Sequence, residues 1–246
     1  MTALSVEQIS CHYGGLKALD SVSFSVAEGA RHVILGPNGA GKTTLFDVIT
    51  GEKSPSSGRI MLFGRDVTGL RSDRRAWLGL ARTFQITNLF WDLTVEENVL
   101  LACLAQEQSR RVFYRPAGSF PDLVAKTRSL LEEFGLGKLA KVKVRSTSYG
   151  EQRQLEIVIA LATQARLILL DEPTAGLSGE ATKLVTRLTG NLPATITVLL
   201  VEHDLDVAFQ VSQTATVLHQ GKLIAHGPIE EVRANPTVRQ IYLGRR

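Results

Sequence analysis

The fold is decided by a stretch that reads Val33-Ile34-Leu35-Gly36-Pro37-Asn38-Gly39-Ala40-Gly41-Lys42-Thr43-Thr44. It starts with a short continuous apolar run, as in a strand buried on both faces, and leads directly into a glycine-rich loop. A helix is predicted from Lys42 to Thr50, with Gly51 as its C-terminal stop. This order of strand, loop and helix predicts a phosphate-binding loop of the form Gly-x-x-x-x-Gly-Lys-Thr.

Each part of the loop from Gly36 to Thr44 has a chemical role in this interpretation, and we expect the whole loop to bind nucleotide. The glycines allow consecutive backbone N–H groups to point at phosphate oxygens. Lys42 supplies a cation to the outer phosphates, and Thr43 offers a hydroxyl to Mg²⁺ at a helix N-terminus. The alternative is a glycine-rich turn with a purely structural role.

A second buried strand ends in two adjacent carboxylates. The apolar run from Leu167 to Leu170 is followed by Asp171 and Glu172. Because α/β sheets place their ligands at the carboxyl ends of strands, both acids are expected in the phosphate site. Asp171 would hold Mg²⁺ through water, and Glu172 would accept a proton from the attacking water. This favours a nucleoside triphosphate hydrolase, although the acids could merely cap the next helix.

Strands and helices surround a helical middle. Residues 4–9 and 22–26 alternate apolar with polar, as half-buried strands do. From about residue 86 to 161 the pattern is helical, with a capping box at Thr94-x-x-Glu97. The α/β pattern then resumes and ends in a hairpin around Gln220-Gly221.

We therefore predict an α/β fold of the P-loop NTPase (RecA-like) class. It would have a mainly parallel sheet, an N-terminal antiparallel β portion and an inserted α-helical subdomain. Residues 1–246 would form a single domain, with a core lobe of residues 1–85 and 165–246 and a helical subdomain of about 86–164.

The composition is that of an ordinary globular protein, with 44% hydrophobic and 21% charged residues, which excludes a collagen-like, disordered or disulfide-stapled chain. No apolar run reaches the ~18 residues that cross a bilayer, and no secretory signal is expected, so we predict a cytosolic address. The net charge of +4 is too mild to indicate a nucleic-acid binder. Cys11 and Cys103 are expected to be packing residues.

The phosphate loop and the acidic pair occur here together with further motifs, and with them the chain resembles the nucleotide-binding subunits of ABC transporters over nearly its whole length. The lid glutamine of that family matches Gln85, its switch histidine matches His203, and its adenine-stacking aromatic matches Tyr13. The signature motif matches Ser148-Tyr149-Gly150-Glu151-Gln152-Arg153, and the loop after the acidic pair matches Ala175-Gly176-Leu177-Ser178.

The resemblance implies an active site composed by two ATPase subunits. Ser148 and Gly150 would bind the γ-phosphate of ATP held by the opposite subunit. Gln85 would bind Mg²⁺ through its carbonyl oxygen, and His203 would hydrogen-bond the γ-phosphate.

The chain departs from the general signature Leu-Ser-Gly-Gly-Gln, because it has Thr147-Ser148-Tyr149-Gly150-Glu151 there. Glu151 therefore adds a carboxylate that the general signature lacks and that the resemblance does not explain. Ser178 also stands where the general pattern has aspartate.

Tyr149-Gly150, the string Ala81-Arg82-Thr83-Phe84-Gln85, the long insertion and the tail 227–244 are most similar to ATPases of branched-chain or hydrophobic amino-acid uptake, and related urea-type importers look similar. This implies integral-membrane permease subunits, a second ATPase subunit in a homo- or heterodimer, and indirectly an extracytoplasmic solute-binding protein. The chain would be peripheral on the inner face of the cell membrane. Residues 86–93 would receive a short permease helix.

Two other functions compete with transport. An ABC ATPase acting on nucleic acid or ribosomes generally carries two cassettes or a long coiled coil, whereas this chain has one cassette and no sustained heptads. Residues 110–115 interleave basic and aromatic side chains, but one such patch is more typical of a solvated loop, so no nucleic-acid partner is expected. A P-loop kinase of small metabolites would need neither Ser148 nor His203.

Overall fold

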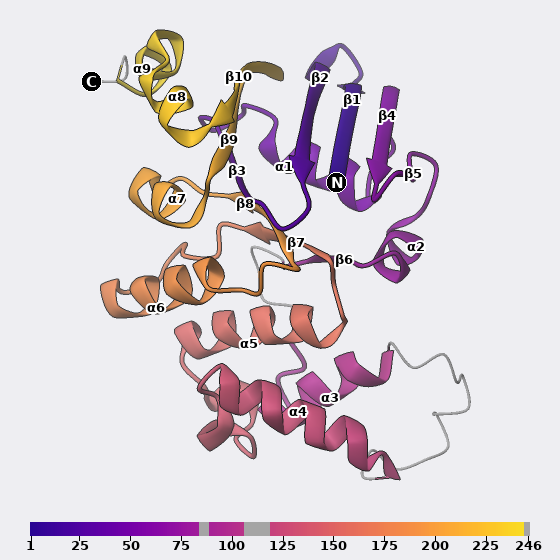
Figure 1. Cartoon of the computed structure of the whole chain (residues 1–246), viewed down its shortest axis with the longest axis vertical. Coiled ribbons are helices and arrows are strands. Elements are labelled where there is room, and N and C mark those ends of the chain that lie inside the picture. The colour runs from indigo at the N-terminus through magenta and orange to yellow at the C-terminus, as the bar shows by residue number, and fades with distance from the viewer. Residues whose placement is uncertain (84–88, 106–118, 244–246) are drawn as a thin grey trace. The chain divides into compact units, whose positions relative to one another are not determined.

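The computed structural model describes residues 1–83, 89–105 and 119–243 of the chain (Figure 1). These residues divide into two compact units. The first contains Met1–Arg82, Arg166–Glu172 and Gly190–Arg246, and the second contains Thr83–Ala165 and Pro173–Thr189. The predicted core lobe included residues 173–189, which here group with the helical unit instead.

A six-stranded sheet forms the centre of the first unit, in the order β10-β9-β3-β8-β7-β6. Its strands are β3 (Arg31–Leu35), β6 (Leu80–Arg82), β7 (Leu167–Asp171), β8 (Thr197–Val201), β9 (Thr214–His219) and β10 (Lys222–Pro228). All neighbours are parallel except β9 and β10, which form the predicted hairpin. Strands β3, β7 and β8 are buried along their whole length, which explains their mostly apolar sequences.

The N-terminal antiparallel portion is confirmed as a four-stranded sheet in the order β2-β1-β4-β5. Its strands are β1 (Thr2–Tyr13), β2 (Leu16–Ala27), β4 (Ser57–Leu62) and β5 (Arg65–Asp66). The remaining elements of this unit are α1 (Lys42–Thr50), α2 (Ser72–Trp77), α7 (Leu205–Val211), α8 (Ile229–Ala234) and α9 (Pro236–Leu243).

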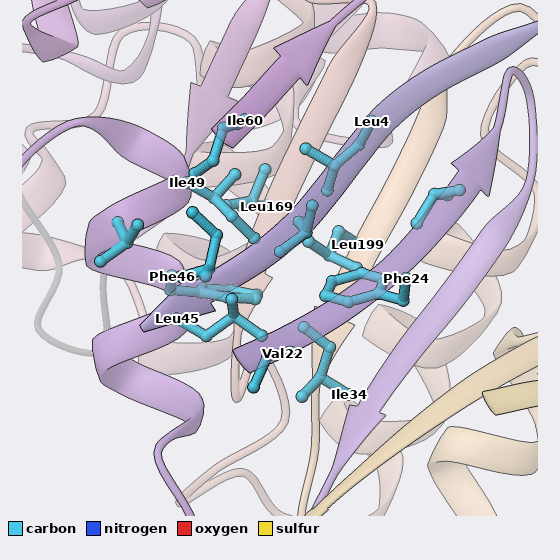
Figure 2. Close-up of a cluster of buried hydrophobic side chains, with 14 of the residues drawn as sticks. Leu4, Val22, Phe24, Ile34, Leu45, Phe46, Ile49, Ile60, Leu169 and Leu199 are labelled. Carbon is cyan, nitrogen blue, oxygen red and sulfur yellow. The ribbon is translucent and has the colours of Figure 1, made fainter. Parts of the chain in front are cut away.

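Helix α1 is anchored by the hydrophobic core of the first unit (Figure 2). Phe46 and Ile49 of the helix lie in one buried cluster with Ile60 of the four-stranded sheet and with Ile34 and Leu169 of the six-stranded sheet. Burial at about 25 cal/mol per Å² of apolar surface is the main force that fixes the helix. The start of α1 is therefore held at the end of β3.

The second unit contains helices α3 (Val95–Ala105), α4 (Pro121–Glu133), α5 (Tyr149–Ala162) and α6 (Gly179–Gly190), with short 3-10 turns at Gly137–Leu139 and Val144–Ser146. The capping box at the start of α3 is confirmed. Glu97 Oε2 accepts a hydrogen bond from the Thr94 N–H at 2.7 Å, and Thr94 Oγ1 accepts one from the Glu97 N–H at 3.2 Å. Within the described ranges, no helix is long and apolar enough to span a membrane.

Candidate functional site

The phosphate loop of the sequence joins β3 to α1, as predicted. Gly41 is the N-cap of α1 and has a φ of 104°. A Cβ atom at this position would lie 2.6 Å from the carbonyl oxygen of Ala18, so both the conformation and the space require glycine. The helix has no side-chain cap and no acidic residue in its first turn. Its first N–H groups are therefore suited to an anion.

The Lys42 side chain folds back into this loop and is only 7% exposed. Its Nζ donates hydrogen bonds to the carbonyl oxygens of Gly36 and Pro37, at 2.7 and 3.1 Å. Burial lowers the pKa of Lys42, while the nearby Glu172 and Asp171 carboxylates act in the opposite direction. The loop thus holds a cation near Asp171, the last residue of β7, and near Glu172, which follows it.

The other loop residues differ in exposure. Gly36 and Ala40 are buried, Pro37 and Thr44 are half-buried, and Asn38, Gly39 and Thr43 are exposed. The Thr43 hydroxyl is thus accessible at the first turn of α1.

Glu172 follows β7 in an unusual backbone conformation. Its φ is 49°, in the left-handed region, and its N–H donates to the carbonyl oxygen of Val201 at 3.0 Å. Such a conformation costs a residue other than glycine about 1–3 kcal/mol and is characteristic of functional sites. His203, two residues beyond the end of β8, contacts Glu172 through its Nε2 and the carboxylate Oε1. The structure thus brings these two predicted site residues together.

Asp171, the last residue of β7, is paired with an arginine that the sequence interpretation did not select. Arg82 Nη2 lies 3.0 Å from Asp171 Oδ2, and Arg82 Nη1 lies 2.7 Å from Asp47 Oδ1 and 3.1 Å from Glu52 Oε2. Burial raises the pKa of Asp171, although Arg82 opposes the shift. In the sequence, Arg82 is part of the string Ala81-Arg82-Thr83-Phe84-Gln85 and ends a short strand, but neither feature indicated its partner.

The signature residues begin helix α5. Ser148 is the N-cap, and its Oγ accepts a hydrogen bond from the Glu151 N–H at 3.4 Å. In return, Glu151 Oε2 accepts hydrogen bonds from the N–H and the hydroxyl of Ser148, at 2.6 and 2.8 Å. Glu151 thereby acquires a role, that of the capping-box acid. The pattern Ser-x-x-Glu could have predicted it.

The neighbouring signature residues are also fixed within the second unit. Arg153 Nη2 donates a hydrogen bond to the Tyr149 hydroxyl at 2.6 Å. A Cβ atom at Gly150 would lie 3.0 Å from that of Ala181 on α6, so the backbone comes close to its neighbour there. Ser178 is exposed, and its carbonyl oxygen accepts a hydrogen bond from Thr182 at the start of α6.

Two tyrosines lie near the ends of the chain. Tyr13, at the end of β1, is 46% exposed, with the Lys53 Nζ 3.7 Å from its ring centroid. Tyr242 of α9 was not predicted as a site residue. Burial raises the pKa of Tyr242 to about 12, and the nearby backbone of Gly36 acts in the opposite direction. The C-terminal helix thus lies near the phosphate loop.

Several predicted residues fall outside the described ranges, namely Gln85, residues 86–88 and residues 110–115. In the rest of the segment 86–93, Leu89 is buried, whereas Phe90 and Trp91 are 61% and 43% exposed.

A glycine-rich loop at the start of a buried helix, with a lysine beside two carboxylates at a strand end, defines a P-loop nucleoside triphosphatase. Residues 19–175 match the family described as ABC transporter, and residues 222–246 match the one described as branched-chain amino acid ATP-binding cassette transporter. The chain belongs to the ATP-binding cassettes of the ABC transporter family, and it is an ATP hydrolase of that type.

Relatives and solved structures agree with this assignment. The chain is 37% identical to the high-affinity branched-chain amino acid transport ATP-binding protein LivG of Salmonella typhimurium, over 98% of this chain and 97% of that protein. It is equally similar to BraF of Pseudomonas aeruginosa, with the same coverage. A nucleotide-free cassette from an ABC transporter, 33% identical, superposes with a TM-score of 0.86 over 98% of this chain and 99% of the other. A cassette in its ADP conformation, 34% identical, gives 0.84 over 99% of both chains.

Proposed function

We propose that this chain hydrolyses ATP to drive uptake of branched-chain or other hydrophobic amino acids through a separate permease. The observation that carries the proposal is that Lys42, at the start of α1, folds back into the loop that follows β3, near Asp171 and Glu172 at the carboxyl end of β7. The names of the relatives support the solute class.

The donor set of the site fits Mg²⁺. Thr43 offers a hydroxyl and Asp171 a carboxylate, and Mg²⁺ prefers such oxygen ligands, completed by substrate phosphates and water. Among the described residues, no group of three or more His, Cys, Asp or Glu could hold a metal ion by itself. Bound with ATP, Mg²⁺ would neutralise charge on the outer phosphates. Gln85 stays a predicted further ligand.

The other site residues have separate roles in ATP binding and hydrolysis. Glu172 is the general base that accepts a proton from the attacking water. The contact with His203 orients this carboxylate, and His203 is exposed enough to reach the γ-phosphate as well. Lys42 exchanges its two carbonyl partners for phosphate oxygens. Tyr13 offers an exposed ring on which adenine can stack.

A second ATPase subunit completes the site in this proposal. Ser148 and Gly150 of one subunit bind the γ-phosphate held by the other, so isolated monomers hydrolyse ATP slowly. The partner is either a second copy of this chain or a different ATPase subunit.

The test is Glu172→Gln, which keeps the size of the side chain and removes the base. Turnover in the assembled complex should fall by ~10²–10⁴ while ATP still binds. Light scattering with ATP should then show a larger species, since hydrolysis no longer separates the subunits. The control is Glu180→Gln, at a glutamate whose side chain is 92% exposed. Parental turnover in Glu172→Gln would refute the assignment of the base.

The permease would dock on the exposed aromatic pair Phe90 and Trp91, with the chain peripheral on the cytoplasmic face of the membrane. Phe90→Glu should reduce copurification with the permease and abolish transport, while ATP binding by the isolated chain stays intact. Trp77→Glu is the matched control, because Trp77 is 56% exposed but lies in the other unit. Unchanged assembly in a folded Phe90→Glu protein would exclude Phe90 from the docking surface.

A further inference from the structure

We propose that Arg82 is a positioning residue for the Mg²⁺ site, because it ties the helix that carries Thr43 to the strand end that carries Asp171. This inference rests on the proposed function. Arg82 itself touches neither nucleotide nor metal in this proposal.

The contacts of Arg82 span two elements of the first unit. The arginine side chain is 9% exposed, and its two terminal nitrogens have different partners. Nη1 lies 2.7 Å from Asp47 Oδ1 on α1, while Nη2 lies 3.0 Å from Asp171 Oδ2 at the end of β7. Each end of the guanidinium group therefore holds a different element.

We call the contacts of Arg82 with Asp47 and Asp171 the bridge. Its helix end, Asp47, lies one turn after Thr43, whose hydroxyl is the proposed Mg²⁺ ligand. Asp47 follows Thr43 by four residues in α1, and residues with this spacing lie on the same helix face one turn apart. Fixing the Asp47 carboxylate therefore fixes the helix face that presents Thr43.

The strand end of the bridge is set by the register of β6 and β7. Arg82 is the last residue of β6 and pairs with Leu169 of β7. Asp171 is two residues beyond Leu169, so its side chain is on the same face of the strand. The side chains of Arg82 and Asp171 consequently lie on the same face of the sheet, near the carboxyl ends of their strands.

The charge of its surroundings is a second reason why an arginine stands at position 82. Arg82 is surrounded by the carboxylates of Asp47, Glu52 and Asp171, whose side chains are 27%, 37% and 7% exposed. Without a cation between them these carboxylates would repel one another. A lysine would restore one charge but not the planar fork that reaches partners on both sides.

The experiment compares ATP affinity of the isolated chain in EDTA and in Mg²⁺, measured by calorimetry. The ratio of the two affinities reports the metal site without any turnover. In both Arg82→Lys and Asp47→Ala we expect this ratio to fall by ~10-fold, as for other residues that orient a metal ligand. The affinity in EDTA should be maintained, because the phosphate loop is intact.

Arg75→Lys is the matched control. Arg75 is 1% exposed and donates hydrogen bonds at 2.7 Å to the carbonyl oxygens of Val48 and Ile49 on the same helix. This variant should unfold at a lower temperature, yet keep the parental affinity ratio.

An unchanged ratio in Arg82→Lys or in Asp47→Ala overturns the bridge, since each variant breaks one end of it. An equal fall in Arg75→Lys also overturns it, because the effect would then follow from general loosening of α1. A parent chain that binds no ATP in either condition refutes the proposed function itself, and the bridge with it.

Discussion

Helices α1 and α5 both begin in predicted phosphate-binding motifs, but their first turns are completed in opposite ways. Helix α1 starts at Gly41, which has no side chain to cap it. Helix α5 starts at Ser148, where the reciprocal hydrogen bonds with Glu151 form a complete capping box. Every helix leaves its first N–H groups without partners inside the helix, so the two solutions have different consequences.

The difference indicates when each motif can bind an anion. The donors of α1 are suited to phosphate in a single chain. At α5, the Glu151 carboxylate already accepts hydrogen bonds from Ser148, so a phosphate must displace that carboxylate before Ser148 can donate to it. We therefore expect changes at α1 to alter nucleotide binding by the isolated chain, and changes at α5 to alter association of two subunits.

The largest effect is expected for Lys42→Ala. Loss of the buried ammonium group removes charge-assisted hydrogen bonds to the phosphates, which are worth about 1.5–3 kcal/mol each. ATP affinity of the isolated chain, measured by calorimetry, should fall accordingly. Lys183→Ala serves as control, because Lys183 is a lysine of α6 whose side chain is 79% exposed. If Lys42→Ala binds ATP as tightly as the parent chain, the start of α1 is not where the nucleotide binds.

A smaller effect is expected for Ser148→Ala, with loss of the N-cap costing about 1 kcal/mol in the free energy of unfolding. ATP affinity of the isolated chain should not change, whereas ATP-dependent association in the Glu172→Gln background should weaken. Thr94→Ala is the matched control, because Thr94 and Glu97 form the same capping box at α3. Thr94→Ala should lower stability similarly and leave association intact. If both variants weaken association equally, the cause is the lower stability of the chain and not the loss of the Ser148 hydroxyl from the signature motif.

The smallest effect is expected for Glu151→Gln. The amide can still accept hydrogen bonds from Ser148, but the favourable interaction of a negative charge with the helix N-terminus, about 0.3–1 kcal/mol, is lost. ATP-dependent association should nevertheless strengthen, because phosphate no longer meets a like charge. Urea unfolding and light scattering measure the two quantities, with Glu97→Gln as control. Weaker association in Glu151→Gln would contradict the competition between carboxylate and phosphate.

The elements that the sequence predicted best are those with local signals. Both ends of α1 agree with the prediction, since the glycine-rich loop and Gly51 bound the helix on either side. The capping box at Thr94 gave the start of α3 for the same reason. The short strands β4 and β5 were not predicted, because much of their length is exposed and carries no continuous apolar run.

The same division applies to the site. Residues close along the chain, such as those of the loop 36–44 and the pair Asp171 and Glu172, could be predicted as site residues from the sequence, because their spacing is itself the signal. The pairing of Arg82 with Asp171, 89 residues away, and with Asp47, 35 residues away, is visible in the three-dimensional structure and not in the sequence. The same holds for the left-handed backbone of Glu172 and for the contact of Glu172 with His203. The physical reason is that these contacts depend on the placement of β6 and β8 on either side of β7, and strand order is set by packing of the whole sheet and not by neighbouring residues.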